Sequence, residues 1–395
     1  MAYSDELCYL FLLMLGIVDC VVNRRWRDYK LMWIIIATMC FYVVYSVVSV
    51  RFNSMGAIMA DAIIEMKSYV SFAVVLAAAP QFTTKEKLIL RYVAIANVVI
   101  CTMVLLAGNE VTLLVMQHPY VGGNTIFVSA MIYILVSIDK EGKVMKPDLA
   151  VATLMLVCGL LCGRSKYFGE IIFALYFMYV YKPGFLKNLT TRHMIVIGMV
   201  LILVVAVTWQ KFDYYFISGN VDATRFDPEV VESFARPVLY LTGGLILIDY
   251  FPFGTGLASF ATKASISPYS GVYHEYGIDK VYGLSEAMPD FICDAYYPLL
   301  AQFGMVGLLL FILFWCYVYS FLRALIRFAP QKDLYYYVIG VSCIIFLLIE
   351  STGGTTLAQG SGVASMMIIG YMCAIGKQIK KEQEIEKQVE TKRYI

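Results

Sequence analysis

Residues 298–322 read PLLAQFGMVGLLLFILFWCYVYSFL, a stretch with no charged residue that is long enough to cross a bilayer as one helix. The whole 395-residue chain has this character, since 60% of its residues are apolar, 15% are charged and the mean hydropathy is +0.73. Soluble proteins are about half apolar and about a quarter charged, and no globular shape could shield this much apolar surface from water. The sequence therefore predicts an all-α polytopic integral membrane protein. It excludes a secreted disulfide scaffold, a disordered regulator and a soluble enzyme.

Apolar stretches like this one recur along the chain and predict about eleven transmembrane helices. The third of them contains Glu65 and Lys67, and several are shorter than the roughly 20 residues that a bilayer requires. The predicted spans are 4–22, 31–50, 59–79, 92–107, 121–138, 149–163, 167–181, 194–210, 298–322, 334–352 and 361–376.

The basic residues of the short loops divide unevenly between the two sides of the predicted membrane. Numbering the loops alternately places sixteen Lys and Arg residues on one side and four on the other. Cytoplasmic loops carry the excess of Lys and Arg, so the N-terminus is expected outside and the C-terminus inside. The tail 377–395 mixes Lys and Glu at helical spacing and predicts a solvated helix on the inner side.

One outer loop, residues 211–297, is far longer than the others, and long extramembrane loops usually carry function. It holds five basic and eleven acidic residues and is rich in tyrosine, whose rings suit sugars or a membrane interface. Its segment Pro237–Phe251 is apolar enough to re-enter the membrane or lie on it, although Gly243 and Gly244 disfavour a full span. The predicted loop therefore contains helical and re-entrant segments.

These features divide the chain into five parts, without a visible internal repeat. They are N-terminal transmembrane helices (1–148), central transmembrane helices with the Arg164 turn (149–210), the large loop (211–297), C-terminal transmembrane helices (298–376) and the charged tail (377–395).

Outer cations are few, and two groups of them suggest an anion site. Arg164 stands in the tight turn LLCGRSKYFGE (160–170), where a guanidinium can bind a phosphate through two hydrogen bonds and Lys166 adds a charge. Both side chains could instead extend to lipid headgroups. Arg225 and Arg236 precede the apolar segment of the large loop and could complete the site or pair with nearby acids. Arg236 is the better placed, because the apolar segment begins directly after it.

Four outer side chains are candidates for proton transfer: His118, His274, Asp290 and Asp294. His274 lies in the middle of the large loop, where an imidazole could act as a base or simply be solvated. Asp294 stands one turn before the span 298–322 and is predicted to share a helical face with Asp290. Partial desolvation would make Asp294 a better base. The alternative is a structural role, because an acidic residue at the start of a helix is stabilised by the helix dipole.

The sequence predicts no metal and no other cofactor. Glu286, Asp290 and Asp294 follow one another at four-residue intervals, but Pro289 interrupts the helix and no histidine joins them. Of the ten cysteines, only Cys293 lies in a polar segment, so neither a disulfide framework nor a zinc pair is expected. A net charge of +2 without a long basic block argues against nucleic-acid binding.

Three segments of this chain, within residues 150 to 325, resemble the superfamily of bacterial O-antigen ligases and Wzy-type O-antigen or capsule polymerases. GRSKYFGE (163–170) looks like the family's Ser- and Arg-containing outer turn. RPVLYLTGGLILIDYFPFGTGLASF (236–260) is similar to the family's Arg, apolar stretch, Pro and Gly-x-Gly before Phe. DAYYPLLAQFGMVGLLLF (294–311) resembles its entry into the next span, although Asp294 and Ala295 stand where many members have His and Asn.

The resemblance implies a metal-independent, inverting glycosyltransferase of the bacterial inner membrane with a periplasmic large loop and N-terminus and a cytoplasmic tail. It implies an undecaprenyl-pyrophosphate-linked oligosaccharide donor, a lipid-linked acceptor and a chain-length regulator as partners. Arg164 and Arg236, with Arg225 and Lys166, would hold the departing pyrophosphate. Asp294 or His274 would deprotonate the acceptor hydroxyl.

Three functions are compared with these sequence features: polysaccharide polymerase, O-antigen ligase and transporter. The missing histidine before position 295 favours a polysaccharide polymerase over an O-antigen ligase, which differs only in its acceptor. A lipid-linked oligosaccharide flippase or other transporter should carry charges deep in several spans. Most deep positions here are apolar, with Asp19, Glu65, Glu170 and Glu350 as exceptions, so polymerase is the favoured hypothesis.

Overall fold

The computed structural model describes residues 4–182, 209, 235–328 and 333–393, and within them every regular element is a helix. The all-α prediction is confirmed for this part of the chain. The α-helices are α1 (Ser4–Val22), α2 (Lys30–Tyr45), α3 (Met55–Ala78), α4 (Thr84–Leu106), α5 (Asn109–Met116), α6 (Pro119–Ser137), α7 (Lys146–Cys158), α8 (Ser165–Leu175), α10 (Ala235–Asp249), α11 (Gly271–Glu275), α12 (Tyr296–Leu299), α13 (Gly304–Phe328), α14 (Leu334–Glu350) and α15 (Gly360–Arg393).

The helices coincide with the predicted spans wherever the structure describes them. Short π-helical turns extend α2 to Val50 and α8 to Val180. The eighth predicted span, 194–210, lies outside the described residues apart from Trp209. In the part of the chain that the structure describes, five helical stretches are long and apolar enough to cross a membrane: Lys30–Val50, Thr84–Leu106, Pro119–Ser137, Tyr296–Phe328 and Gly360–Ile385. The chain is thus a helical membrane protein, and the total of eleven spans stays a prediction.

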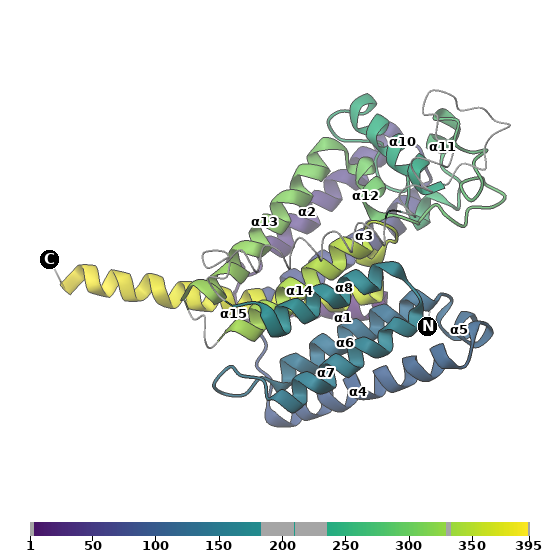
Figure 1. The fold of residues 1–395 in the computed structure, drawn as a ribbon. Helices are drawn as coiled ribbons and strands as arrows, with labels where there is room; N and C mark the ends of the chain where they lie inside the picture. Colours follow the sequence, from purple (N-terminus) through teal and green to yellow (C-terminus); the bar gives the residue numbers. More distant parts are fainter. Residues whose placement is uncertain (1–3, 183–208, 210–234, 329–332, 394–395) are drawn as a thin grey trace.

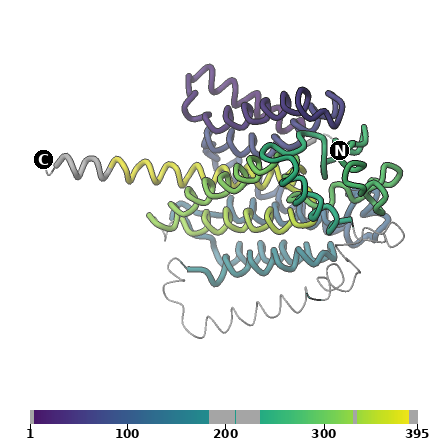
Figure 2. The backbone as a smooth tube through the Cα atoms, turned by 90° about the horizontal axis from the view of Figure 1, so that it is seen from above, coloured from purple at the N-terminus to yellow at the C-terminus, as the bar shows by residue number. Residues whose placement is uncertain are grey.

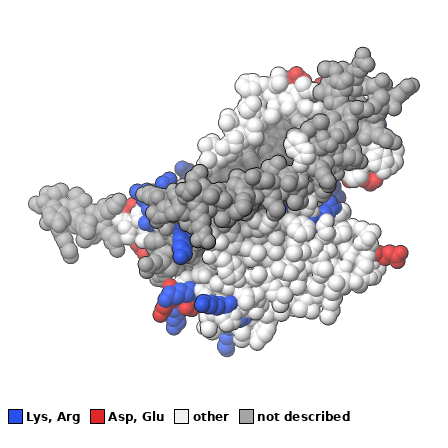
Figure 3. Space-filling view, viewed as in Figure 1, with Lys and Arg blue, Asp and Glu red and all other residues white. Residues whose placement is uncertain are grey.

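The long helices run side by side in one bundle, with the two chain termini at opposite ends (Figures 1 and 2). α15 packs against α3, α13 and α14, and α6 packs against α4 and α7. We call the end that carries α10, α11 and α12 the loop end, and the end from which α15 projects the basic end. Lys and Arg gather at the basic end, whereas the flank between the two ends is almost free of charge in Figure 3. This pattern is the one expected of a bundle surrounded by lipid.

The charged residues of the third predicted span lie toward the loop end. Lys67 forms ion pairs with Asp5 and Glu6 at the start of α1, the latter at 2.9 Å. The buried Asp61 accepts a hydrogen bond of 2.7 Å from the backbone N–H of Ala258 in the large loop. The side chains of Asp61, Glu65 and Lys67 are therefore buried within the protein, which explains how α3 carries charges that a lipid-exposed helix would not tolerate.

The large loop meets α13 through two glycines whose backbones touch. A methyl group added to Gly254 would lie 2.4 Å from the nitrogen of Gly304, and one added to Gly304 would lie 2.3 Å from the nitrogen of Gly254. Both glycines have positive φ angles, 75° and 62°. The N–H of Gly256 donates to the carbonyl of Gln302 at 2.8 Å directly beside them. Only glycine fits at either position.

Two expectations for the large loop change with the structure. The apolar segment after Arg236 is the helix α10, which lies at the loop end against α12 (Figure 1). The prediction that Asp290 and Asp294 share a helical face is wrong, because residues 290–294 form turns and α12 begins only at Tyr296. Pro289 precedes this turn and Ala295 is extended, with φ −158° and ψ 143°, so no helix can continue through the segment.

Replacing Gly304 by Ala should destabilise the protein strongly. Its φ of 62° and ψ of −163° belong to a region that essentially only glycine occupies, and the added methyl would meet backbone that cannot move away. We expect a loss of roughly 2–5 kcal/mol of folding free energy, seen as a lower thermal midpoint in detergent.

The matched control is Gly244→Ala, since Gly244 is helical and exposed and nothing lies near its added methyl. Alanine there should leave the thermal midpoint unchanged or slightly higher. Equal midpoints for the two variants would contradict the contact between Gly254 and Gly304.

Candidate functional site

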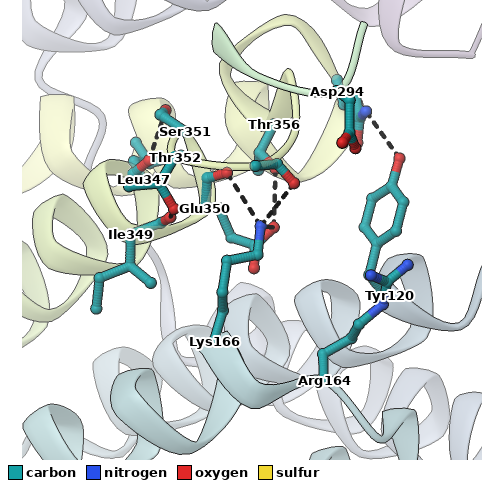
Figure 4. A network of polar contacts seen from close by, with 12 residues as sticks. Tyr120, Arg164, Lys166, Asp294, Leu347, Ile349, Glu350, Ser351, Thr352 and Thr356 are labelled. Carbon is teal, nitrogen blue, oxygen red and sulfur yellow. Dashed lines mark hydrogen bonds and ion pairs between the residues drawn. The ribbon is translucent and has the colours of Figure 1, made fainter. Parts of the chain in front are cut away.

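The candidate site lies at the loop end, where three of the predicted cations surround one loop. This loop, residues 351–359, joins α14 to α15, and we call it the α14–α15 loop. Lys166 reaches it from the start of α8, while Arg164 lies beside Tyr120 and Asp294 lies nearby in the large loop, as Figure 4 shows. Arg236 reaches it from the first turn of α10.

Gly353 in the α14–α15 loop is where two of the cations meet. The Lys166 ammonium donates to the Gly353 carbonyl at 2.8 Å. The Arg236 guanidinium lies against the other side of the glycine, because a methyl group there would come within 3.0 Å of Arg236 Cζ. The absence of a side chain at position 353 therefore lets Arg236 and Lys166 approach each other.

Lys166 is held by its surroundings on every side. Besides the Gly353 carbonyl, it donates to the carbonyl and to the Oε2 carboxylate oxygen of Glu350, both at 3.2 Å. An ammonium has three N–H donors, and these contacts use all of them. Glu350 is only 3% exposed and also accepts from the Thr356 hydroxyl at 3.3 Å. Lys166 therefore fixes the α14–α15 loop and adds positive charge, but offers no free donor.

Arg236 and Asp294 form an ion pair that joins α10 to the large loop. Arg236 Nη2 lies 2.5 Å from Asp294 Oδ2, and Arg236 Nε donates to the Asp294 carbonyl at 3.3 Å. Each side chain is 31% exposed, so the pair can be reached from outside. A guanidinium has five N–H donors, and these two contacts leave others to bind an anion.

Arg164 lies next to a histidine and is linked to the α14–α15 loop only indirectly. It follows Gly163, whose φ of 66° makes the tight turn, and its guanidinium contacts the ring nitrogens of His118. It also lies over the ring of Tyr120 at 5.7 Å, and the Tyr120 hydroxyl accepts from Gln359 at 3.0 Å. These contacts tie Arg164 to the α14–α15 loop through Tyr120.

His118 is a neutral partner for Arg164 near neutral pH. Burial lowers the pKa of His118 from its ordinary 6.5, and the positive charges of Arg164 and Lys166 act in the same direction, while Asp294 opposes them.

The other predicted residues are not brought into this group. His274 lies in α11, is 58% exposed, and pairs with Asp279 at 2.8 Å within the large loop. Asp290 and Glu286 are exposed on turns. Arg225 lies outside the described residues. Within the described ranges no group of three or more His, Cys, Asp or Glu residues is placed to hold a metal ion.

Sequence reasoning did not single out the α14–α15 loop, which supplies much of the site. Its sequence from 351 to 359, STGGTTLAQ, has no charged residue and contributes mainly carbonyl groups, a glycine and an amide. The sequence feature that could have pointed to this loop is its polar composition between two apolar spans, on the predicted outer side of the membrane.

Two tyrosines of the large loop cannot form a sugar-binding surface, because Tyr273 and Tyr296 are buried in the core.

An apolar groove begins beside the site and runs along the bundle between α2 and α13. Its volume is about 270 Å³, and its walls include Ile35, Tyr42, Phe303 and Phe314. At the loop end the groove reaches Tyr296, which lies two residues after Asp294. A long apolar chain lying in this groove would have its head near the ion pair of Arg236 and Asp294.

No protein-family model matches this chain, and no curated protein matches it in sequence. The resemblance to O-antigen ligases and polymerases is therefore carried only by the motifs quoted above.

Replacing Arg164 by Gln should raise the pKa of His118, because it removes a neighbouring positive charge that disfavours the imidazolium. The titration can be followed by NMR of the protein labelled at histidine. Lys143→Gln, which changes an exposed cation at the basic end, should leave the His118 titration unchanged. An unchanged curve in Arg164→Gln would show that Arg164 does not contact His118.

Proposed function

We propose that this protein is a polysaccharide polymerase, a membrane glycosyltransferase that moves an oligosaccharide from undecaprenyl pyrophosphate to a sugar hydroxyl of a lipid-linked acceptor. The observation that carries the proposal is the arrangement of Arg164, Lys166 and Arg236 around the α14–α15 loop beside Asp294. In this proposal the loop end faces the periplasm of a bacterial inner membrane, and the product is O-antigen or capsular polysaccharide.

A pyrophosphate leaving group fits the cations of the site. Its negative charge grows as the bond to the sugar breaks, and preorganised guanidinium groups stabilise that charge. Arg164 and Arg236 retain N–H donors for this purpose, whereas Lys166 keeps the α14–α15 loop in place between them. In the proposed site, two of the cations bind the pyrophosphate and the third holds the α14–α15 loop.

Asp294 is the base that this geometry favours. Arg236 contacts its Oδ2 atom, which leaves Oδ1 to take the proton of the acceptor hydroxyl. The hydroxyl oxygen then attacks the anomeric carbon from the side opposite the pyrophosphate, the bond to the pyrophosphate breaks, and the configuration inverts. His274 is the weaker candidate, because its polar contact is with Asp279 in the large loop.

The apolar groove supports a lipid-linked substrate. A volume of about 270 Å³ along α2 and α13 accommodates part of an isoprenoid chain, and its loop end lies close to Asp294 in the chain. Glu65 also borders the groove at this end. An O-antigen ligase would use the same donor and differ in its acceptor.

Arg164→Ala and Arg236→Ala should each reduce polymer formation by about 100-fold or more, because each removes a charge-assisted contact to the leaving group. Replacement by Lys should restore activity only in part, since Lys cannot make two parallel hydrogen bonds. The measurement is the rate of polymerisation by the purified protein with a lipid-linked oligosaccharide.

Arg51→Ala is the matched control, because Arg51 is a cation on the same predicted side of the membrane and its side chain hydrogen-bonds only to its own helix turn.

A second comparison leaves every charged residue in place. Gly353→Ala would displace the Arg236 guanidinium, whereas Gly354→Ala meets only ordinary contacts, so the former should lose activity and the latter keep it. Normal polymerisation by both arginine variants would rule out the pyrophosphate site.

Asp294→Asn should leave donor binding intact and slow turnover by roughly 100-fold, since an amide cannot accept the proton. His274→Ala should cost far less. Single-turnover rates, with donor binding measured separately, compare the two. The opposite ranking would assign the base to His274.

A further inference from the structure

A second groove lies at the basic end of the bundle, far along α13 from the site described above. It opens between α13 and α15 and has a volume of about 380 Å³. Tyr319, Arg323, Arg327 and Phe328 of α13 line one side, and Lys380 of α15 lines the other. The groove therefore combines aromatic and apolar walls with three positive charges.

The three charges of this groove have no acidic counterpart within it. Arg323 and Arg327 stand four residues apart and so share one face of α13. No acidic side chain lines the groove, and within the described residues none of the three cations forms an ion pair. The acids Asp19, Asp28 and Glu141 at this end pair with other cations. Glu382 and Glu384 follow Lys380 on α15 but do not line the groove. The lining of the groove thus carries three positive charges and no negative charge.

The charges lie at the depth of lipid headgroups. Arg323 follows Gly304, the loop-end start of α13, by 19 residues, and Lys380 follows Gly360, the start of α15, by 20. At 1.5 Å per residue both lie about 30 Å from the starts of their helices, which is the thickness of the hydrocarbon core. Two helices thus bring their cations independently to the level of the phosphates of the far leaflet.

We propose that this groove binds an anionic phospholipid of the leaflet at the basic end. The phosphodiester accepts hydrogen bonds from Arg323, Arg327 and Lys380, and one acyl chain lies along the wall formed by Tyr319 and Cys316. A zwitterionic lipid should bind less well, because the ammonium of its headgroup is repelled by the same three cations. The site does not depend on the proposed enzymatic function.

The test is lipid binding to the full-length protein in detergent, measured by native mass spectrometry. Phosphatidylglycerol and phosphatidylethanolamine with identical acyl chains are the two probes. The unmodified protein should retain more phosphatidylglycerol than phosphatidylethanolamine. The variant Arg323→Gln/Arg327→Gln/Lys380→Gln should lose that preference, with affinity for phosphatidylglycerol falling roughly fivefold for each cation removed.

The matched control is Arg24→Gln/Lys140→Gln/Lys143→Gln, which removes three cations from the same end outside the groove and gives the same net charge. It should keep the preference, and thermal midpoints should show that both variants are folded. Equal losses in the two variants would mean a general attraction to the basic end and would overturn the proposal. Binding of soluble glycerol phosphate as tight as that of the lipid would also overturn it.

Discussion

The arrangement of the loop end depends on the contact between the backbones of Gly254 and Gly304. No side chain fits at either position, so the large loop can approach the start of α13 more closely than any other pair of residues would allow. The hydroxyls of Tyr42 and Tyr45 in α2 donate to the carbonyls of Phe303 and Gly254 on either side of this contact. The same junction fixes the segment that leads to Asp294 and thus sets its distance from Arg236.

Around this junction the charged groups are held by neutral acceptors as much as by opposite charges. Lys166 binds two carbonyls and one carboxylate, Arg164 binds an imidazole with lowered pKa, and Arg236 binds both a carboxylate and a carbonyl. Carboxylates offset the charge of Lys166 and of Arg236, whereas Arg164 forms no ion pair with a described residue, and all three side chains are held in place. An incoming anion therefore meets donors that are already oriented, so little reorganisation is required.

Long apolar runs, and the positions of charged residues relative to them, were enough to predict the helices and to suggest the candidate residues Arg164, Lys166, Arg236 and Asp294. Their mutual placement was not predictable, because it depends on carbonyls and on Gly353, which leave no chemical signature in a sequence. The expected helical face of Asp290 and Asp294 was wrong since the spacing rule ignored the turn that follows Pro289. Glu65 and Lys67 looked anomalous only because a sequence does not show that the large loop and α1 cover α3.

The contact between Gly254 and Gly304 also constrains the order of biosynthesis. The large loop is bound by Ser46 and Asp61, which leave the ribosome long before it, and by Gly304, which leaves the ribosome fifty residues after Gly254. The loop emerges with only its earlier partners in the membrane. It can close only when the translocon has delivered α13, so the arrangement of the loop end is completed late, after most of the chain has been inserted.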